Sequence, residues 1–331
     1  MIKKLKIITL LPATFILFSC GNKANPQSNM TANSPLSNRT VSKPYTINTK
    51  ISEVINDSVF GDYGRLIFPV NSGYYSGDTL GNLRLTWYNN INPAKTVEIA
   101  NYMKEHAEAG KTIFYDIYTE EEKLANPQKA NTGLFFFKGK SGGKFAVCSA
   151  GGGYAYVGAM HDSFPHALEL SKMGYNAFAL IYRPNLQMAC EDLARAISFI
   201  FNHANELEID TNGYSLWGGS AGGRMVAWLG SYGTAAFGEK DFPRPSAVII
   251  QYTGHTDYTK NEPPTYSCVG ENDWIANWQT MERRLKNMKA IGIPTEFHKY
   301  PNLGHGFGLG IGTEAEGWIN EAVAFWERQI K

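Results

Sequence analysis

From residue 113 to the C-terminus, short apolar runs alternate with segments of helical periodicity. The runs predicted as strands are Thr112–Tyr118, Gly133–Lys138, Lys144–Ser149, Asn176–Tyr182, Tyr214–Trp217, Ala247–Tyr252, Thr265–Val269 and Glu296–Tyr300. The third and sixth of these contain unbroken apolar stretches, as expected of strands covered on both faces. The alternation of such strands with helices predicts an α/β fold whose sheet is mostly parallel.

Apolar residues spaced three and four apart predict two amphipathic helices. One carries Leu193, Ala196, Ile197, Ile200, Phe201 and Ala204, and the other carries Trp318, Ile319, Ala322, Val323 and Trp326 near the C-terminus. A third helix is predicted at 93–109, because Asn92 is a good N-cap, Pro93 fits the first helical position and Gly110 is a stop signal. We interpret residues 51–110 as an N-terminal extension, or as a cap over one edge of the sheet.

The first 19 residues have the pattern of a signal peptide. Three lysines precede the apolar run 7–18, which is too short for a stable membrane span. The segment Leu17-Phe18-Ser19-Cys20-Gly21 resembles the lipobox of bacterial lipoproteins, in which the cysteine is acylated and becomes the first mature residue. This resemblance implies a protein anchored by lipid at Cys20 in the bacterial cell envelope, at the outer membrane or facing the periplasm. The alternative is an ordinary secretory signal.

Composition divides the remainder of the chain. Residues 20–50 are rich in Asn, Ser, Thr, Pro and Lys and are predicted to be a flexible tether, whereas 111–331 are predicted to be one catalytic domain. The 31 Lys and Arg residues balance 30 Asp and Glu residues without a basic block, which argues against a nucleic-acid partner. The cysteines after Cys20 fit no zinc spacing, so we expect no metal, no cofactor and no disulfide framework.

The pentapeptide Gly218-Gly219-Ser220-Ala221-Gly222 matches the pattern G-x-S-x-G. It follows the predicted strand Tyr214–Trp217 and precedes apolar residues at helical spacing. A turn this tight strains the serine backbone and projects its hydroxyl above the sheet, so Ser220 is the predicted nucleophile. The alternative is a glycine-rich turn whose serine only caps the helix.

A serine nucleophile requires a base and an acid that orients the base. His305 lies in a glycine-flanked loop after the last predicted strand, at the sheet edge where sites form in open α/β folds. Asp273 follows the strand Thr265–Val269 and is the predicted acid, with Glu271 and then Asp257 as alternatives. The chain order serine, aspartate, histidine is that of α/β-hydrolases.

A glycine run, Gly151-Gly152-Gly153, follows the strand Lys144–Ser149. Such a run allows backbone N–H groups to point at a developing oxyanion. We therefore expect the oxyanion hole to be formed by Gly152, Gly153 and the N–H of Ala221. The competing interpretation, a dinucleotide-binding loop, lacks the third glycine of G-x-G-x-x-G.

These motifs together resemble the α/β-hydrolase superfamily over roughly residues 112–331. The likeness is to its small esterases with an H-G-G-G loop, the acetyl-esterase and hormone-sensitive-lipase-like group that includes feruloyl and acetyl-xylan esterases. The resemblance implies an eight-stranded, mostly parallel sheet with helices on both faces. One difference is that Ala150 stands where that group has its histidine, so the side chain that holds the loop is absent.

The resemblance implies a serine esterase that acts on carboxylic esters, with short acyl or feruloyl groups on carbohydrate as the expected substrates. Tyr154, Trp274 and Phe307 flank the predicted site and are candidates to stack on sugar rings, although aromatic residues beside a site are often core. The alternatives are a serine peptidase of the prolyl-oligopeptidase-like type and a catalytically silent hydrolase-fold lipoprotein that only binds. The expected partners are a small or glycan ester and, through the lipid, a membrane.

Overall fold

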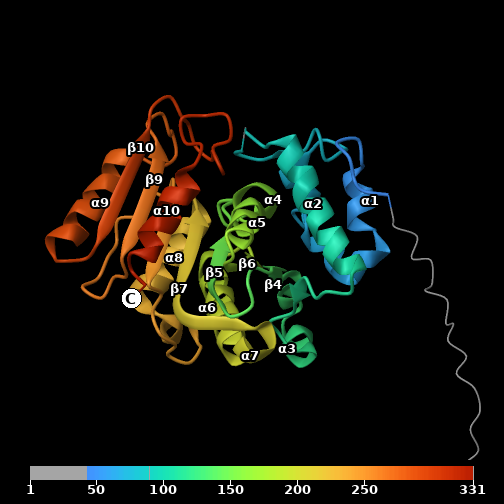
Figure 1. Cartoon of the computed structure of the whole chain (residues 1–331), viewed down its shortest axis with the longest axis horizontal. Helices are drawn as coiled ribbons and strands as arrows, with labels where there is room; N and C mark the ends of the chain where they lie inside the picture. Colours follow the sequence, from blue (N-terminus) through green and yellow to red (C-terminus); the bar gives the residue numbers. More distant parts are fainter. Residues whose placement is uncertain (1–42, 89, 331) are drawn as a thin grey trace, which may run out of the picture. The chain divides into compact units, whose positions relative to one another are not determined.

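The computed structural model describes residues 43–88 and 90–330, and a large sheet is its central element (Figure 1). The strands of this sheet are β3 (Phe114–Tyr115), β4 (Gly133–Phe137), β5 (Gly143–Ser149), β6 (Asn176–Ile181), β7 (Ile209–Gly219), β8 (Ala247–Gln251), β9 (Thr265–Gly270) and β10 (Thr295–Tyr300). Their order is β10-β9-β8-β7-β5-β6-β4-β3. Only the pairings that involve β4 are antiparallel. The predicted mostly parallel eight-stranded sheet is confirmed.

Helices cover both faces of the sheet. They are α1 (Ile51–Ile55), α2 (Pro93–Glu108), α3 (Glu120–Ala125), α4 (Ala159–Asp162), α5 (Phe164–Lys172), α6 (Leu186–Asn202), α7 (Ala204–Leu207), α8 (Ala221–Tyr232), α9 (Trp278–Ala290) and α10 (Trp318–Glu327). On β7, Tyr214 contacts Phe201 of α6, whereas Trp217 contacts Trp318 of α10. Side chains three positions apart on a strand point to opposite faces, so α6 and α10 lie on opposite sides.

Local sequence accounts for two helix starts near the site. The Asn92 side chain accepts a hydrogen bond from the Lys95 N–H, and Pro93 occupies the first turn, so α2 begins where the sequence predicts. The Asn277 side chain caps α9 in the same way by accepting from the Thr280 N–H. The cap therefore belongs to Asn277, which leaves the nearby Asp273 carboxylate available for another role.

The N-terminal extension packs against the sheet and its helices. It contains α1, α2, a small hairpin of β1 (Tyr75–Ser76) and β2 (Arg84–Leu85), and a 3-10 helix at Ser58–Leu66. The ring of Tyr63 stacks on Phe114 of the edge strand β3, so the extension contacts this edge of the sheet. Helix α2 also packs on α4 and α5 (Figure 1).

The predicted end of the tether at residue 50 is wrong. Tyr45 is buried, and its backbone N–H and C=O both bond to the Asn101 side chain of α2 at 2.8 and 3.0 Å. These contacts place residues 44–50 in the folded part. The ring of Tyr45 is buried in the folded part although most of the residues around it in the sequence are polar.

The predicted signal peptide and Cys20 lie outside the described residues. Within the described part, no helix combines the length and apolarity needed to cross a bilayer. The remaining cysteines, Cys148, Cys190 and Cys268, are buried free thiols there.

Candidate active site

Ser220 lies at the turn between β7 and α8. Its φ of 51° and ψ of −117° are strained values for a residue with a side chain. The turn is held by a hydrogen bond of 3.0 Å from the Ser220 N–H to the Gln251 carbonyl. A Cβ on Gly222 would lie 2.0 Å from the Ser149 carbonyl oxygen, so only glycine permits this approach of α8 to β5. The predicted strand–turn–helix geometry is thus present around the serine.

His305 lies between the serine and the carboxylate of Asp273. Its Nε2 is 3.0 Å from the Ser220 Oγ, and its Nδ1 is 2.8 Å from the Asp273 Oδ2. A carboxylate only accepts hydrogen bonds, so Nδ1 carries the proton and Nε2 is free to accept from the serine hydroxyl. Both the imidazole and the carboxylate are almost wholly removed from solvent. This arrangement can pass a proton away from the serine.

The loop after β9 fixes the carboxylate of Asp273. Its Oδ1 accepts hydrogen bonds from the backbone N–H groups of Ile275 and Ala276, at 2.8 and 2.7 Å. Both oxygens also lie within 3.1 Å of the His305 Nδ1. The carboxylate is therefore held by its own loop and needs no other side chain to face the imidazole.

The two alternative acids lie elsewhere. Glu271 forms an ion pair with Lys299 on the surface. Asp257 accepts a hydrogen bond from the Tyr232 hydroxyl. Neither of these contacts involves His305, so the structure brings together Ser220, Asp273 and His305 from the predicted set.

The loop after β5 passes directly beside the serine. A Cβ on Gly151 would lie 2.9 Å from the Ser220 Cβ. Gly152, Gly153 and Tyr154 all have positive φ, at 129°, 61° and 59°, which turns the loop sharply. Among the described residues, the N–H groups of Gly152 and Gly153 find no protein acceptor. The loop therefore presents free donors next to the nucleophile, as an oxyanion hole requires.

The three aromatic candidates differ in role. The Tyr154 hydroxyl donates to the Ala221 carbonyl at 2.9 Å, which ties the glycine loop to the start of α8. Trp274 is 71% exposed beside Asp273. Phe307 is only 3% exposed and packs edge-on against Tyr252, so the prediction of a stacking surface there is wrong.

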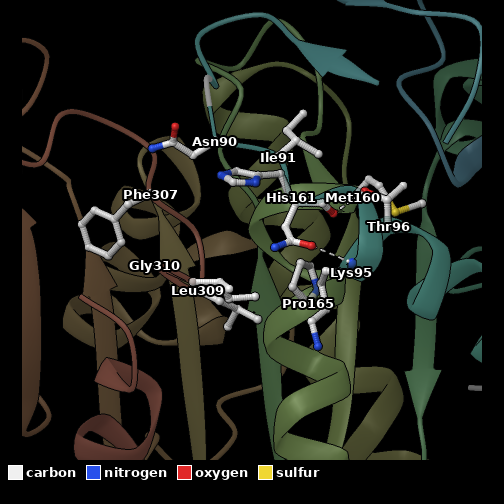
Figure 2. Close-up of a pocket in the computed structure, with 12 residues that line it drawn as sticks. Asn90, Ile91, Lys95, Thr96, Met160, His161, Pro165, Phe307, Leu309 and Gly310 are labelled. Atoms are coloured by element: carbon white, nitrogen blue, oxygen red, sulfur yellow. Dashed lines mark hydrogen bonds between the residues drawn. The ribbon is translucent and has the colours of Figure 1, made fainter. Parts of the chain in front are cut away.

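A small cavity of about 20 Å³ lies beside the loop after β10, which carries His305 (Figure 2). Phe307 and Leu309 line one side of it, and Met160 and His161 line another (Figure 2). The His161 Nε2 donates to the Gly306 carbonyl at 2.8 Å, so this ring holds the loop that carries His305. The cavity has room for about one water molecule and is too small for a substrate.

Three residues at the site, Trp87, Tyr88 and Asp162, were not predicted from the sequence. Trp87 has a φ of 70° and is 42% exposed, and a Cβ on Gly153 would lie 2.9 Å from its ring. The Tyr88 hydroxyl donates to the buried carboxylate of Asp162 at 2.9 Å. No motif marks these positions, because their roles come from contacts between distant segments.

The strand order, the strained serine turn and the Ser220–His305–Asp273 line define an α/β-hydrolase. The resemblance to esterases of this superfamily is confirmed by the model of the BD-FAE family (bifunctional feruloyl/acetyl esterase), which matches residues 138–285. The protein is accordingly a carboxylic ester hydrolase. No curated protein matches the chain.

Solved structures show the same fold. An acetyl ester-xyloside bifunctional hydrolase from Caldicellulosiruptor lactoaceticus is 22% identical with a TM-score of 0.55, over 65% of this chain and 95% of that one. An α/β-hydrolase from a Medee basin deep-sea metagenome library is 21% identical with a TM-score of 0.53, over 60% and 93%. A thermophilic esterase of Thermogutta terrifontis is 20% identical with a TM-score of 0.51, over 58% and 85%.

Proposed function

We propose that this protein removes short acyl or feruloyl groups from carbohydrate through an acyl-enzyme on Ser220. The observation that carries the proposal is the line from the Ser220 Oγ to the His305 Nε2 at 3.0 Å and from the Nδ1 to the Asp273 Oδ2 at 2.8 Å. His305 takes the hydroxyl proton as the oxygen attacks the ester carbonyl. Asp273 holds the imidazole tautomer and stabilises its positive form.

Charge on the carbonyl oxygen is stabilised by backbone donors in this mechanism. The N–H groups of Gly152 and Gly153 come from the loop, and the N–H of Ala221 comes from the positive end of α8. His305 then protonates the leaving alcohol. The same imidazole activates a water molecule that hydrolyses the acyl-enzyme and returns the serine to its starting state.

Two features support carbohydrate as the alcohol part of the substrate. One is the match to the BD-FAE family model, together with the acetyl ester-xyloside activity named for a structural relative. The other is the pair of exposed indole rings, Trp274 beside Asp273 and Trp87 beside Gly153. Exposed flat rings offer an apolar face to the C–H groups of a sugar.

The test of the chemistry is Ser220→Ala. We expect kcat on p-nitrophenyl acetate and acetate release from acetylated xylan to fall about 10⁶-fold, because the three side chains act as a unit. Ser141→Ala, in an exposed turn, is the control and should match the wild type. A wild-type protein that neither hydrolyses esters nor reacts with a fluorophosphonate at Ser220 would support the silent-binding alternative instead.

The test of the substrate class is Trp274→Ala. We expect KM for acetylated xylan to rise several-fold, while kcat and KM for p-nitrophenyl acetate stay within twofold of the wild type. The small ester has no sugar ring to stack on the indole. Equal effects on both substrates would contradict a sugar-binding role for this ring.

We also propose that Cys20 carries a lipid that anchors the enzyme in the cell envelope. The proposal rests on the lipobox-like sequence alone. Expressed in a bacterium, the full chain should partition into detergent, and Cys20→Ala should move it to the aqueous phase. An unchanged partition would argue against lipidation.

A further inference from the structure

Asp162, at the end of α4, is a buried carboxylate behind the glycine loop. It is only 2% exposed. Its Oδ2 accepts from the Gly151 N–H at 2.6 Å and from the Tyr88 hydroxyl at 2.9 Å, and its Oδ1 accepts from the Tyr252 hydroxyl. No lysine or arginine in the described residues forms an ion pair with it. Burying a carboxylate costs free energy unless hydrogen bonds or a counter-ion compensate for the lost water. Asp162 is compensated by three hydrogen-bond donors and no counter-ion, which indicates that the carboxylate has a specific role at this position.

The three donors belong to separate segments of the chain. Tyr88 comes from the N-terminal extension, Gly151 from the glycine loop and Tyr252 from the residue after β8. Burial and the adjacent carboxylate raise the pKa of both tyrosine hydroxyls well above 10. Both tyrosines are therefore protonated at neutral pH and act as donors there.

The carboxylate also lies against the turn that carries the nucleophile. A Cβ on Gly219 would lie 2.5 Å from both oxygens of Asp162. The ring of Tyr252 in turn contacts the His305 ring edge-on, with centroids 5.1 Å apart. The Asp162 side chain thus contacts both the glycine loop and the serine turn, and its hydrogen-bond partner Tyr252 contacts the base, His305.

The hydrogen bond to Gly151 decides which amides are left for the substrate. The Gly151 N–H is occupied by Asp162, and the next two amides, of Gly152 and Gly153, are free. Neither Ala150 nor the glycines have a polar side chain that could hold the loop. Donors in an oxyanion hole act only when they are held in place before the reaction.

We propose that Asp162 is a positioning residue that fixes the oxyanion loop against the serine turn, with Tyr88 and Tyr252 as its supporting donors. This inference rests on the proposed esterase function. Asp162 does not touch the substrate. Its effect is on the position of the Gly152 and Gly153 amides, so it acts on the transition state more than on substrate binding.

The experiment compares Asp162→Asn, Tyr88→Phe and Tyr252→Phe with a matched control. The control is Tyr118→Phe, which removes the 2.6 Å hydrogen bond from the Tyr118 hydroxyl to another buried carboxylate, that of Asp192. The measurements are kcat and KM for p-nitrophenyl acetate and the inhibition constant of a trifluoromethyl ketone. The Ser220 oxygen adds to the ketone carbonyl as His305 takes the hydroxyl proton, and the resulting tetrahedral oxyanion lies in the hole.

We expect Asp162→Asn to lower kcat about 100-fold and Tyr88→Phe about tenfold, with KM within threefold of the wild type. The affinity for the ketone should fall by the same factor as kcat/KM. Tyr118→Phe should leave all three quantities unchanged. If Asp162→Asn does not fold, the two tyrosine variants decide the result.

Folded variants that keep kcat and ketone affinity within twofold of the wild type would overturn the positioning role. A loss of kcat without a loss of ketone affinity would overturn it too. Both results leave the esterase function intact, because the wild type is active and Ser220→Ala is not. An inactive wild type would instead refute the proposed function and this inference with it.

Discussion

The two sides of Ser220 are built in different ways. On the proton-transfer side, His305 and Asp273 each follow a strand, and the loop of Asp273 supplies the hydrogen bonds that hold it. On the oxyanion side, the glycine loop is held by Asp162, whose tyrosine partners lie 74 and 90 residues away in the sequence. The first side is local and easily recognised. The second depends on contacts that only the fold creates.

Of the two sides, the local one is expected to show the larger loss of activity. Asp273→Asn should lower kcat about 10⁴-fold, because an amide favours the wrong imidazole tautomer. Glu271→Gln is the matched control, since this carboxylate pairs with Lys299 on the surface. It should leave steady-state ester hydrolysis within twofold of the wild type. Similar losses in both variants would mean that the acid has been assigned to the wrong residue.

A smaller loss is expected on the oxyanion side. Gly152 has a φ of 129°, and a Cβ there would lie 2.1 Å from the Tyr156 carbonyl oxygen. Gly152→Ala should therefore displace the loop and lower kcat about 100-fold. Gly142→Ala is the control, because Gly142 also has a positive φ, of 70°, but a Cβ there would lie in open space. That variant should lose about 1 kcal/mol of stability and no activity at saturating substrate.

The smallest effect on turnover at neutral pH is expected from His166, which lies near Asp162. Burial lowers its pKa to about 4. In the unfolded chain the pKa is about 6.5, so the unfolded state binds more protons between these values. This contribution to stability, about 3 kcal/mol at most, is present above pH 6.5 and lost as the pH falls towards 4. Urea unfolding of His166→Gln should depend less on pH over this range than unfolding of the wild type; identical pH profiles would contradict the assignment.

The sequence predicts the sheet and its helices well. All eight predicted strands are present, and α2 starts after Asn92 as the sequence predicts. The pattern works because buried strands are short, apolar and separated by turns. The end of the tether was misplaced because one buried residue, Tyr45, is invisible to composition.

The candidate site is predictable where a residue type and a strand end coincide. Ser220, Asp273 and His305 each meet that condition. Trp87 and Asp162 do not. The position of Trp87 depends on how the extension folds back onto the glycine loop, and that of Asp162 depends on how α4 lies behind the same loop. Phe307 looked like a substrate contact only because it is close to His305 in the sequence. Its ring turns inward, and no periodic pattern marks that direction.

The contact between Tyr88 and Asp162 has a practical consequence for shortening this chain. A fragment that begins at residue 111 keeps every residue of the nucleophile, base and acid. It loses the segment that braces the oxyanion loop and that covers the ring of Phe114. Such a minimal hydrolase would be a poor starting point for engineering, and the boundary for any fusion or domain transplant belongs before Pro44.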